Sequence, residues 1–94
     1  MSNNRNLIIQ WCRVSSDNSA VATAKLPISF PNNIMYAIAC DAGASQASWG
    51  NGTAATVWGW DSGSSNNNTV VARVYRTSGG AFSGAAGAIF SIGY

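Results

Sequence analysis

Hydrophobic and polar residues alternate in several short runs of this chain, a pattern typical of β-strands and not of helices. In residues 7–14, for example, Leu7, Ile9 and Trp11 share one face of an extended chain. No stretch of a dozen residues has the 3.6-residue period of an amphipathic helix. The sequence therefore predicts an all-β fold, a small antiparallel β-sandwich, with strands at residues 7–14, 20–30, 34–41, 56–60, 69–77 and 88–94.

Short polar segments rich in glycine, serine and asparagine separate these strands. Residues 15–19, 31–33 and 61–68 are predicted to be turns, and residues 42–55 and 78–87 longer loops. Pro27 lacks a backbone N–H, which indicates a sheet edge or a bulge at that point. Residues 1–6 are polar and aperiodic, so we interpret them as a tether or the end of an upstream segment, leaving one domain over residues 7–94.

Several predicted strands are apolar on both faces. In residues 34–41, one side carries Ile34, Tyr36, Ile38 and Cys40 and the other Met35, Ala37 and Ala39. A small sandwich has a single core, which covers only one face of each strand. Part of the remaining apolar surface should therefore be covered by another chain, and self-association is the simplest way to cover it.

The composition restricts the chemistry. The 94 residues, 9.7 kDa in all, have room for one domain; 9% are charged, and there is no histidine and no glutamate. The commonest general base and metal ligand is thus missing, and we expect no metal site and no cofactor. Asp41 and Asp61 are the one plausible pair for glycoside hydrolysis, but no recognisable constellation surrounds them, so we predict that the protein is not an enzyme.

The charge distribution argues against two kinds of partner. The net charge of +2 is spread over the chain, whereas nucleic-acid binding needs a dense basic stripe, so we expect no nucleic-acid partner. The longest apolar runs are much shorter than a membrane span, so we expect no membrane insertion.

The two cysteines, Cys12 and Cys40, leave three alternatives: a disulfide, free core thiols or a reactive site. Both lie in apolar strand-like runs and not in a C-x-x-C loop. We favour buried, reduced thiols.

Three patches carry a resemblance to a known family: Ile8-Ile9-Gln10-Trp11, Leu26-Pro27-Ile28-Ser29-Phe30-Pro31-Asn32 and Ile89-Phe90-Ser91-Ile92-Gly93-Tyr94. Their order and spacing resemble the C-terminal domain of bacteriophage tail fibres, over residues 7–94. Cys12 stands where that family usually has glycine, and Leu26 where it usually has phenylalanine.

This resemblance implies a homotrimer at the distal end of a phage or prophage tail fibre on the virion, assembled in the bacterial cytoplasm. It further implies adhesion to the host surface, through lipopolysaccharide or another glycan, and a dedicated assembly chaperone. Two other functions stay open: a structural trimerisation or capping module without receptor contact, and a stand-alone carbohydrate-binding module.

Aromatic rings beside amides and hydroxyls are the usual means of holding a sugar. The candidate receptor-binding residues in and beside the loops are Trp49, Asn51, Trp58, Trp60, Asp61, Asn66, Asn67 and Arg76. Each also has a plain structural interpretation. Trp58 and Trp60 fit the core as well as a site, the asparagines fit turns, and the arginine fits a solvated surface. Trp11 lies in a dense apolar strand, and we predict that it belongs to the core.

Overall fold

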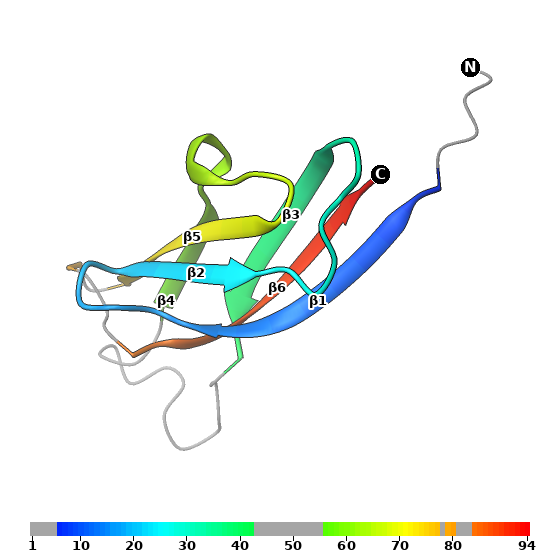
Figure 1. Cartoon of the computed structure of the whole chain (residues 1–94). Coiled ribbons are helices and arrows are strands. Elements are labelled where there is room, and N and C mark those ends of the chain that lie inside the picture. The colour runs from blue at the N-terminus through cyan, green and yellow to red at the C-terminus, as the bar shows by residue number, and fades with distance from the viewer. Residues whose placement is uncertain (1–5, 43–55, 78, 81–83) are drawn as a thin grey trace.

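The computed structural model describes residues 6–42, 56–77, 79–80 and 84–94. Within these ranges the chain forms six strands and one 3-10 turn, η1 (Figure 1). The elements are β1 (Ile8–Ser15), β2 (Val21–Lys25), β3 (Ile34–Asp41), β4 (Thr56–Trp60), η1 (Ser62–Ser64), β5 (Thr69–Arg76) and β6 (Ala86–Gly93). All six predicted strands are confirmed, and the third and fourth have the predicted bounds.

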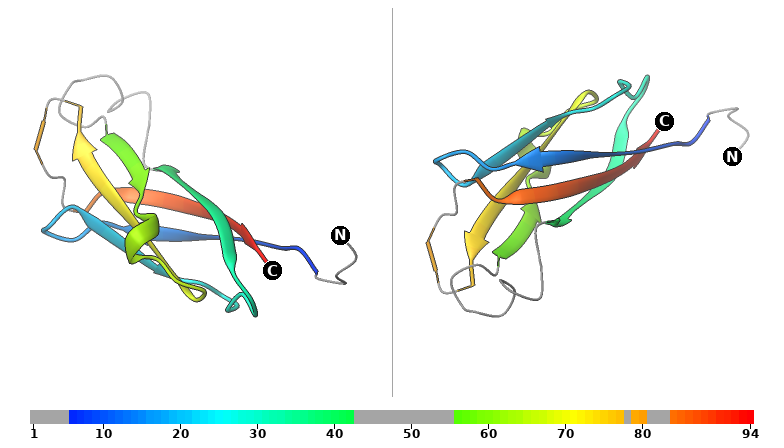
Figure 2. Two further views of the ribbon diagram at one scale, coloured as in Figure 1. Left: turned by 90° about the horizontal axis from the view of Figure 1, so that it is seen from above. Right: turned by 90° about the horizontal axis from the view of Figure 1, so that it is seen from below.

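The strands form two three-stranded antiparallel sheets. Sheet A has the order β1-β6-β3 and sheet B the order β2-β5-β4. Figure 2 shows the two layers from opposite sides. The predicted all-β, antiparallel architecture is therefore confirmed.

The core lies between the two sheets and is made mostly of small side chains. Ile89 of β6 and Val70 and Val74 of β5 are completely buried, together with several alanines and Phe30. β2 and β6 bury alternate residues, as period-two patterning requires, whereas β5 buries the consecutive residues Val70, Val71 and Ala72.

Two glycines of β6 face this core and leave room for aromatic rings. A Cβ placed on Gly87 would fall on three atoms of the six-membered ring of Trp58. A Cβ on Gly93 would lie 2.7 Å from an atom of the Phe30 ring. Since no side chain can occupy these two positions, the rings pack directly against the backbone of β6.

The second predicted strand is shorter than expected. β2 ends at Lys25, and residues 26–30 cross between the sheets. The N–H groups of Leu26 and Phe30 donate to the carbonyl oxygens of Asn68 and Asn67, both at 2.8 Å. Ile28 lies between them and is exposed, although it shares the strand parity of Leu26 and Phe30, which are buried. Pro27 explains the difference, because it lacks the N–H that a continuing ladder would use.

The pairing of β3 with β6 is irregular near its start. Ile34 pairs with Gly93 and Tyr36 with Ile92, so Met35 is an extra residue, a β-bulge. Ile34 consequently packs against the core, whereas Tyr36, Ile38 and Cys40 are exposed. The prediction that these four residues share one face is therefore wrong for Ile34.

The side of sheet A that points away from the core is an apolar surface, which we call the outer face of sheet A. In register across β1, β6 and β3 it consists of three rows: Ile9, Ile92 and Tyr36; Trp11, Phe90 and Ile38; and Arg13, Ala88 and Cys40. Trp11 is 70% exposed, so its prediction as a core residue is wrong. Its run is apolar on both faces, and the core covers the face of Gln10, not that of Trp11.

The two thiols lie on different faces of sheet A. Cys12 pairs with Ile89 and packs against the core, whereas Cys40 pairs with Ala88 and is exposed. Both are free cysteines. The prediction of buried thiols is thus wrong for Cys40, because the apolar strand that carries it turns that side outward. In the part of the chain that the structure describes, no helix is long and apolar enough to cross a membrane.

Candidate functional site

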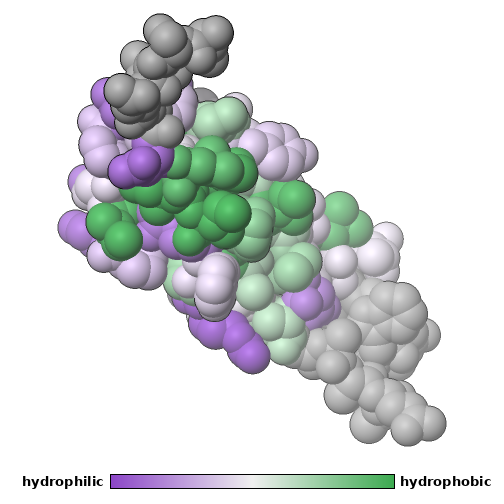
Figure 3. Space-filling model, turned by 90° about the vertical axis from the view of Figure 1, so that its right-hand side faces the viewer, coloured by the Kyte–Doolittle hydropathy of each residue, from purple (hydrophilic) through white to green (hydrophobic). Residues whose placement is uncertain are grey.

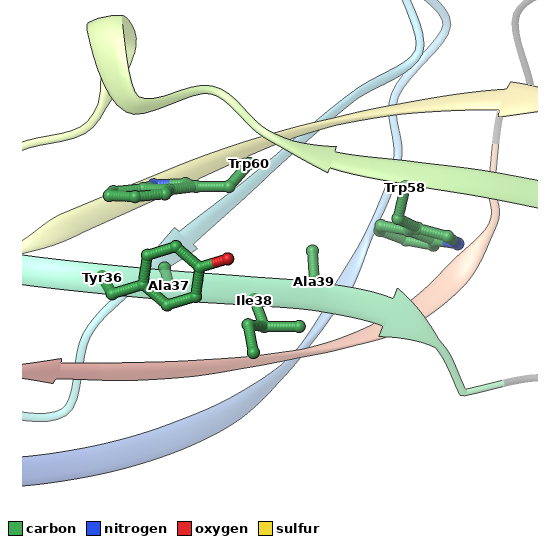
Figure 4. Close-up of a pocket in the computed structure, with 6 residues that line it drawn as sticks. All are labelled: Tyr36, Ala37, Ile38, Ala39, Trp58 and Trp60. Atoms are coloured by element: carbon green, nitrogen blue, oxygen red, sulfur yellow. The ribbon is translucent and has the colours of Figure 1, made fainter.

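An open groove lined by aromatic rings lies where the edge strands of the two sheets meet. Its walls come from β3 and β4, and its volume is about 290 Å³. We call it the aromatic groove; its lining residues are Tyr36, Ala37, Ile38, Ala39, Trp58 and Trp60 (Figure 4). Trp58 and Trp60 point the same way from β4, as their spacing predicts.

The Trp60 end of the groove is held by a chain of hydrogen bonds. The Trp60 Nε1–H donates to the Ser65 hydroxyl at 3.1 Å, and that hydroxyl donates to the carbonyl oxygen of Asp61 at 2.8 Å. The N–H of Val71 also donates to Ser65 Oγ, at 2.9 Å. The Tyr36 ring meets Trp60 edge to face, with centroids 5.4 Å apart and planes at 78°. This is a favoured aromatic geometry, so both rings are positioned before any ligand arrives.

The Trp58 end is held in a similar way from the other side. The Trp58 Nε1–H donates to Thr56 Oγ1 at 2.8 Å, and the Thr56 hydroxyl donates to Asp41 Oδ2 at 3.1 Å. The ring rests on Gly87 of β6. The position of the Trp58 indole is therefore fixed by Thr56 of β4, Asp41 at the end of β3 and Gly87 of β6.

These contacts decide what the groove can offer to a ligand. Both indole N–H groups already donate within the protein, so the two tryptophans present ring surface and not hydrogen-bond donors. In Figure 4 the Tyr36 hydroxyl points along the groove from the Trp60 end. Flat apolar rings with a hydroxyl at the rim match the apolar face and polar edge of a sugar.

A charged pair lies just beyond Trp60. Both Nη2 and Nε of Arg73 contact Asp61 Oδ2, at 2.9 and 3.0 Å, and Asp61 Oδ1 accepts from the N–H of Ser64 at 3.1 Å. The hydrogen bond from Arg73, with a further one from Ser64, lowers the pKa of Asp61. Asp61 therefore caps η1 as a carboxylate and fixes the turn that carries Ser65.

The structure brings some of the predicted site residues together and separates others. Trp58, Trp60 and Asp61 lie in or beside the groove. Asn66 and Asn67 hold the turn before β5: Asn66 Oδ1 accepts from the N–H of Asn68 at 3.0 Å, and Asn67 Nδ2 donates to the carbonyl oxygen of Asn32 at 3.1 Å.

Of the other predicted site residues, only Arg76 lies within the part of the chain that the structure describes. Arg76 is exposed at the end of β5, in register with Thr56. Trp49 and Asn51 fall outside the described residues, as does most of the predicted loop over residues 42–55.

Tyr36 is the aromatic residue of the groove that the sequence prediction missed, together with the smaller lining residues Ala37, Ile38 and Ala39. It was assigned to an apolar strand face, and only the packing of β3 beside β4 places its ring against Trp60. The spacing of Tyr36 and Ile38 marks a shared face but does not identify the strand across from it. Among the described residues there is no group of three aspartate, glutamate, cysteine or histidine side chains that could hold a metal ion.

The three sequence patches that carry the family resemblance meet in the fold, and the third of them, in β6, pairs with the groove strand β3. Trp11 pairs with Phe90 across β1 and β6, and the Gln10 side chain bonds the backbone of Ile28. The N–H of Asn32 donates to the carbonyl oxygen of Tyr94 at 2.7 Å. These patches therefore form the framework of the domain, and the groove is lined by β3 and β4, which carry none of the three patches.

Comparison with known families agrees with this fold and framework. Residues 4–94 match the family model described as "Putative tail fiber protein gp53-like, C-terminal". Because the match covers nearly all of the chain, this protein belongs to that tail fibre family, in the C-terminal domain that the model describes. Comparisons with curated proteins and with solved structures returned no match.

Proposed function

We propose that this domain is the receptor-binding tip of a phage or prophage tail fibre and that the aromatic groove binds a glycan of the bacterial surface, such as lipopolysaccharide. The observation that carries the proposal is a set of three rings in an open groove: Trp58 and Trp60 are held by hydrogen bonds within the protein, and Tyr36 packs edge to face on Trp60. Membership of a tail fibre family supports this proposal, since it suggests a virion-associated protein.

Adhesion by such a domain depends on many weak contacts made at once. The tip is a homotrimer at the distal end of the fibre in this proposal, so three grooves engage one surface and their effective affinity rises steeply. An assembly chaperone in the bacterial cytoplasm would cover the apolar surface of each chain until the trimer forms.

The proposed role is binding without catalysis. Glycoside hydrolysis needs one carboxyl group that stays protonated to donate its proton. The pKa of Asp61 is lowered by Arg73, so this side chain is held as a carboxylate, and Asp41 accepts from the Thr56 hydroxyl. Both aspartates thus support the walls of the groove.

The test compares two tyrosines with similar exposure. Tyr36→Ala removes one wall of the groove from a side chain that is 55% exposed, whereas Tyr75→Ala removes a 50% exposed ring from the outer face of sheet B. Binding would be measured on immobilised lipopolysaccharide and on an array of bacterial surface glycans. We expect Tyr36→Ala to weaken binding about 5- to 150-fold, since stacking on one aromatic side chain contributes about 1–3 kcal/mol. Tyr75→Ala should leave binding unchanged. Equal binding by both folded variants and the wild type would refute the groove as the site.

The three sequence patches that carry the family resemblance form the framework of the domain. This favours one other function, a capping module that organises the fibre without contacting a receptor. Exchanging residues 7–94 between two fibres distinguishes these functions. Host range follows the exchanged segment if this domain binds the receptor, and stays with the rest of the fibre if it is only a cap.

A further inference from the structure

The two outer faces of the sandwich differ in charge. The outer face of sheet B carries the charged residues Lys25 and Arg73 as well as the exposed apolar residues Val57 and Tyr75. The outer face of sheet A holds a single charged residue, Arg13, at one corner of its three rows and no carboxylate. Figure 3 shows hydrophobic side chains gathered into one continuous area on the side that it displays.

The exposed area of this face is large for so small a chain. Ile9, Trp11, Tyr36, Ile38 and Phe90 are each between 44% and 70% exposed. Since a large side chain presents roughly 150–250 Å² when free, these five leave on the order of 500 Å² of mostly apolar surface in water. A stable interface buries about 800 Å² on each partner, so this face supplies more than half of one.

The apolar surface continues past the edge of sheet A on the β1 side. A hollow of about 210 Å³ lies there, lined by Ile9, Gln10, Trp11, Pro27 and Ile28. On the other side, β3 is an edge strand whose residues 34–40 carry no charge.

We infer that the outer face of sheet A is the surface through which copies of this chain associate. A partner rich in charge would find only Arg13 to pair with, whereas a second copy brings an apolar face of the same size. In a closed ring of copies every such face is covered at once, with no free surface left to extend the assembly. This inference rests on the proposed fibre-tip function for the number of copies, three, and assigns the surface that they use.

An interface on the outer face of sheet A would lie next to the aromatic groove. Tyr36 and Ile38 belong both to the outer face of sheet A and to the groove. Association through this face therefore brings a neighbouring copy to the rim of each groove, while Trp58 and Trp60 stay on the side away from the contact.

Sedimentation equilibrium of the 94-residue chain tests the surface with matched variants. Trp11→Glu places a charge on the outer face of sheet A at a residue that is 70% exposed and outside the groove. Val57→Glu places the same charge on the outer face of sheet B, at a residue 58% exposed. We expect the wild type and Val57→Glu to sediment as trimers and Trp11→Glu as a folded monomer by circular dichroism.

Thiol labelling gives a second readout that does not depend on the stability of Trp11→Glu. Cys40 lies on the outer face of sheet A, so we expect its alkylation to be at least tenfold slower in the associated wild type than in the chain diluted to monomers. A monomeric wild type, or trimers in both glutamate variants, would overturn the inference. Trp60→Ala separates the two proposals, since it should lose glycan binding and keep the trimer.

Discussion

Gln10 and Ile28 are joined as two residues of neighbouring strands would be, although only one of them lies in a strand. The Gln10 Nε2–H donates to the carbonyl oxygen of Ile28 at 2.7 Å, and Gln10 Oε1 accepts from the N–H of Ile28 at 3.0 Å. The side-chain amide thus stands in for a peptide group. It ties the segment after Pro27 to β1 where the backbone ladder has stopped.

Replacing this amide should cost stability. Gln10→Met keeps the shape of the side chain but leaves both Ile28 groups without their partner, and we expect the free energy of unfolding to fall by about 2 kcal/mol. Chemical denaturation at constant chain concentration measures this. Ser29→Ala, an exposed position in the same segment, serves as the control and should change little; an equal loss in both variants would contradict the role of Gln10.

The contact between Gly87 and Trp58 predicts a position-specific effect of one methyl group. Gly87→Ala places a Cβ inside the Trp58 ring, so the ring must move and the groove must change shape. We expect a loss of about 1–3 kcal/mol in the free energy of unfolding and a changed tryptophan fluorescence spectrum. Gly59→Ala is the matched control, since a Cβ there has nothing within 4 Å; the two variants should not behave alike.

The ion pair of Asp61 with Arg73 predicts a dependence of stability on acid. The pKa of Asp61 is lowered from its ordinary value of 3.8, so the folded state binds this proton less readily than the unfolded state. The contribution of Asp61 is complete above pH 3.8 and is lost as the pH falls through the lowered pKa. Asp61→Asn should therefore be less stable at neutral pH and show a shallower acid unfolding curve. Parallel curves for variant and wild type would contradict this.

The burial of Cys12 predicts slow thiol chemistry at neutral pH. Removal from water raises the pKa of Cys12 above 9.0, so less thiolate forms at any given pH. In a Cys40→Ser background, alkylation of the remaining thiol should be slower than that of a free cysteine and should keep increasing above pH 9. A rate that levels off below that pH would indicate an exposed thiol.

Much of the fold follows from local pattern, and the reasons are visible in particular strands. Residues 34–41 and 56–60 alternate cleanly and are bounded by turn residues, so their extent is determined locally. The common direction of Trp58 and Trp60 follows from the same period of two. Pro27 marks the end of the regular ladder for the chemical reason that it lacks a donor.

The arrangement of the site depends on contacts between distant residues, and these have no local signature. Alternation divides a strand into two faces but does not say which face meets the core, and for this reason the prediction that Trp11 belongs to the core is wrong. Tyr36 meets Trp60 because β3 and β4 lie at the same edge of the sandwich, a result of how two sheets stack. The extra residue Met35 likewise depends on pairing with β6.

The place of β6 in sheet A has a consequence for how the protein is made. This strand comes last of the six in the sequence but lies between β1 and β3, which touch no other strand of their sheet. A ribosome delivers β1 and β3 many residues before the strand that joins them, so both wait with their backbone groups unpaired during translation. Until β6 is synthesised, a nascent chain can pair wrongly with other nascent chains. A chaperone that binds the chain at this stage is most useful in cells that produce many copies at once.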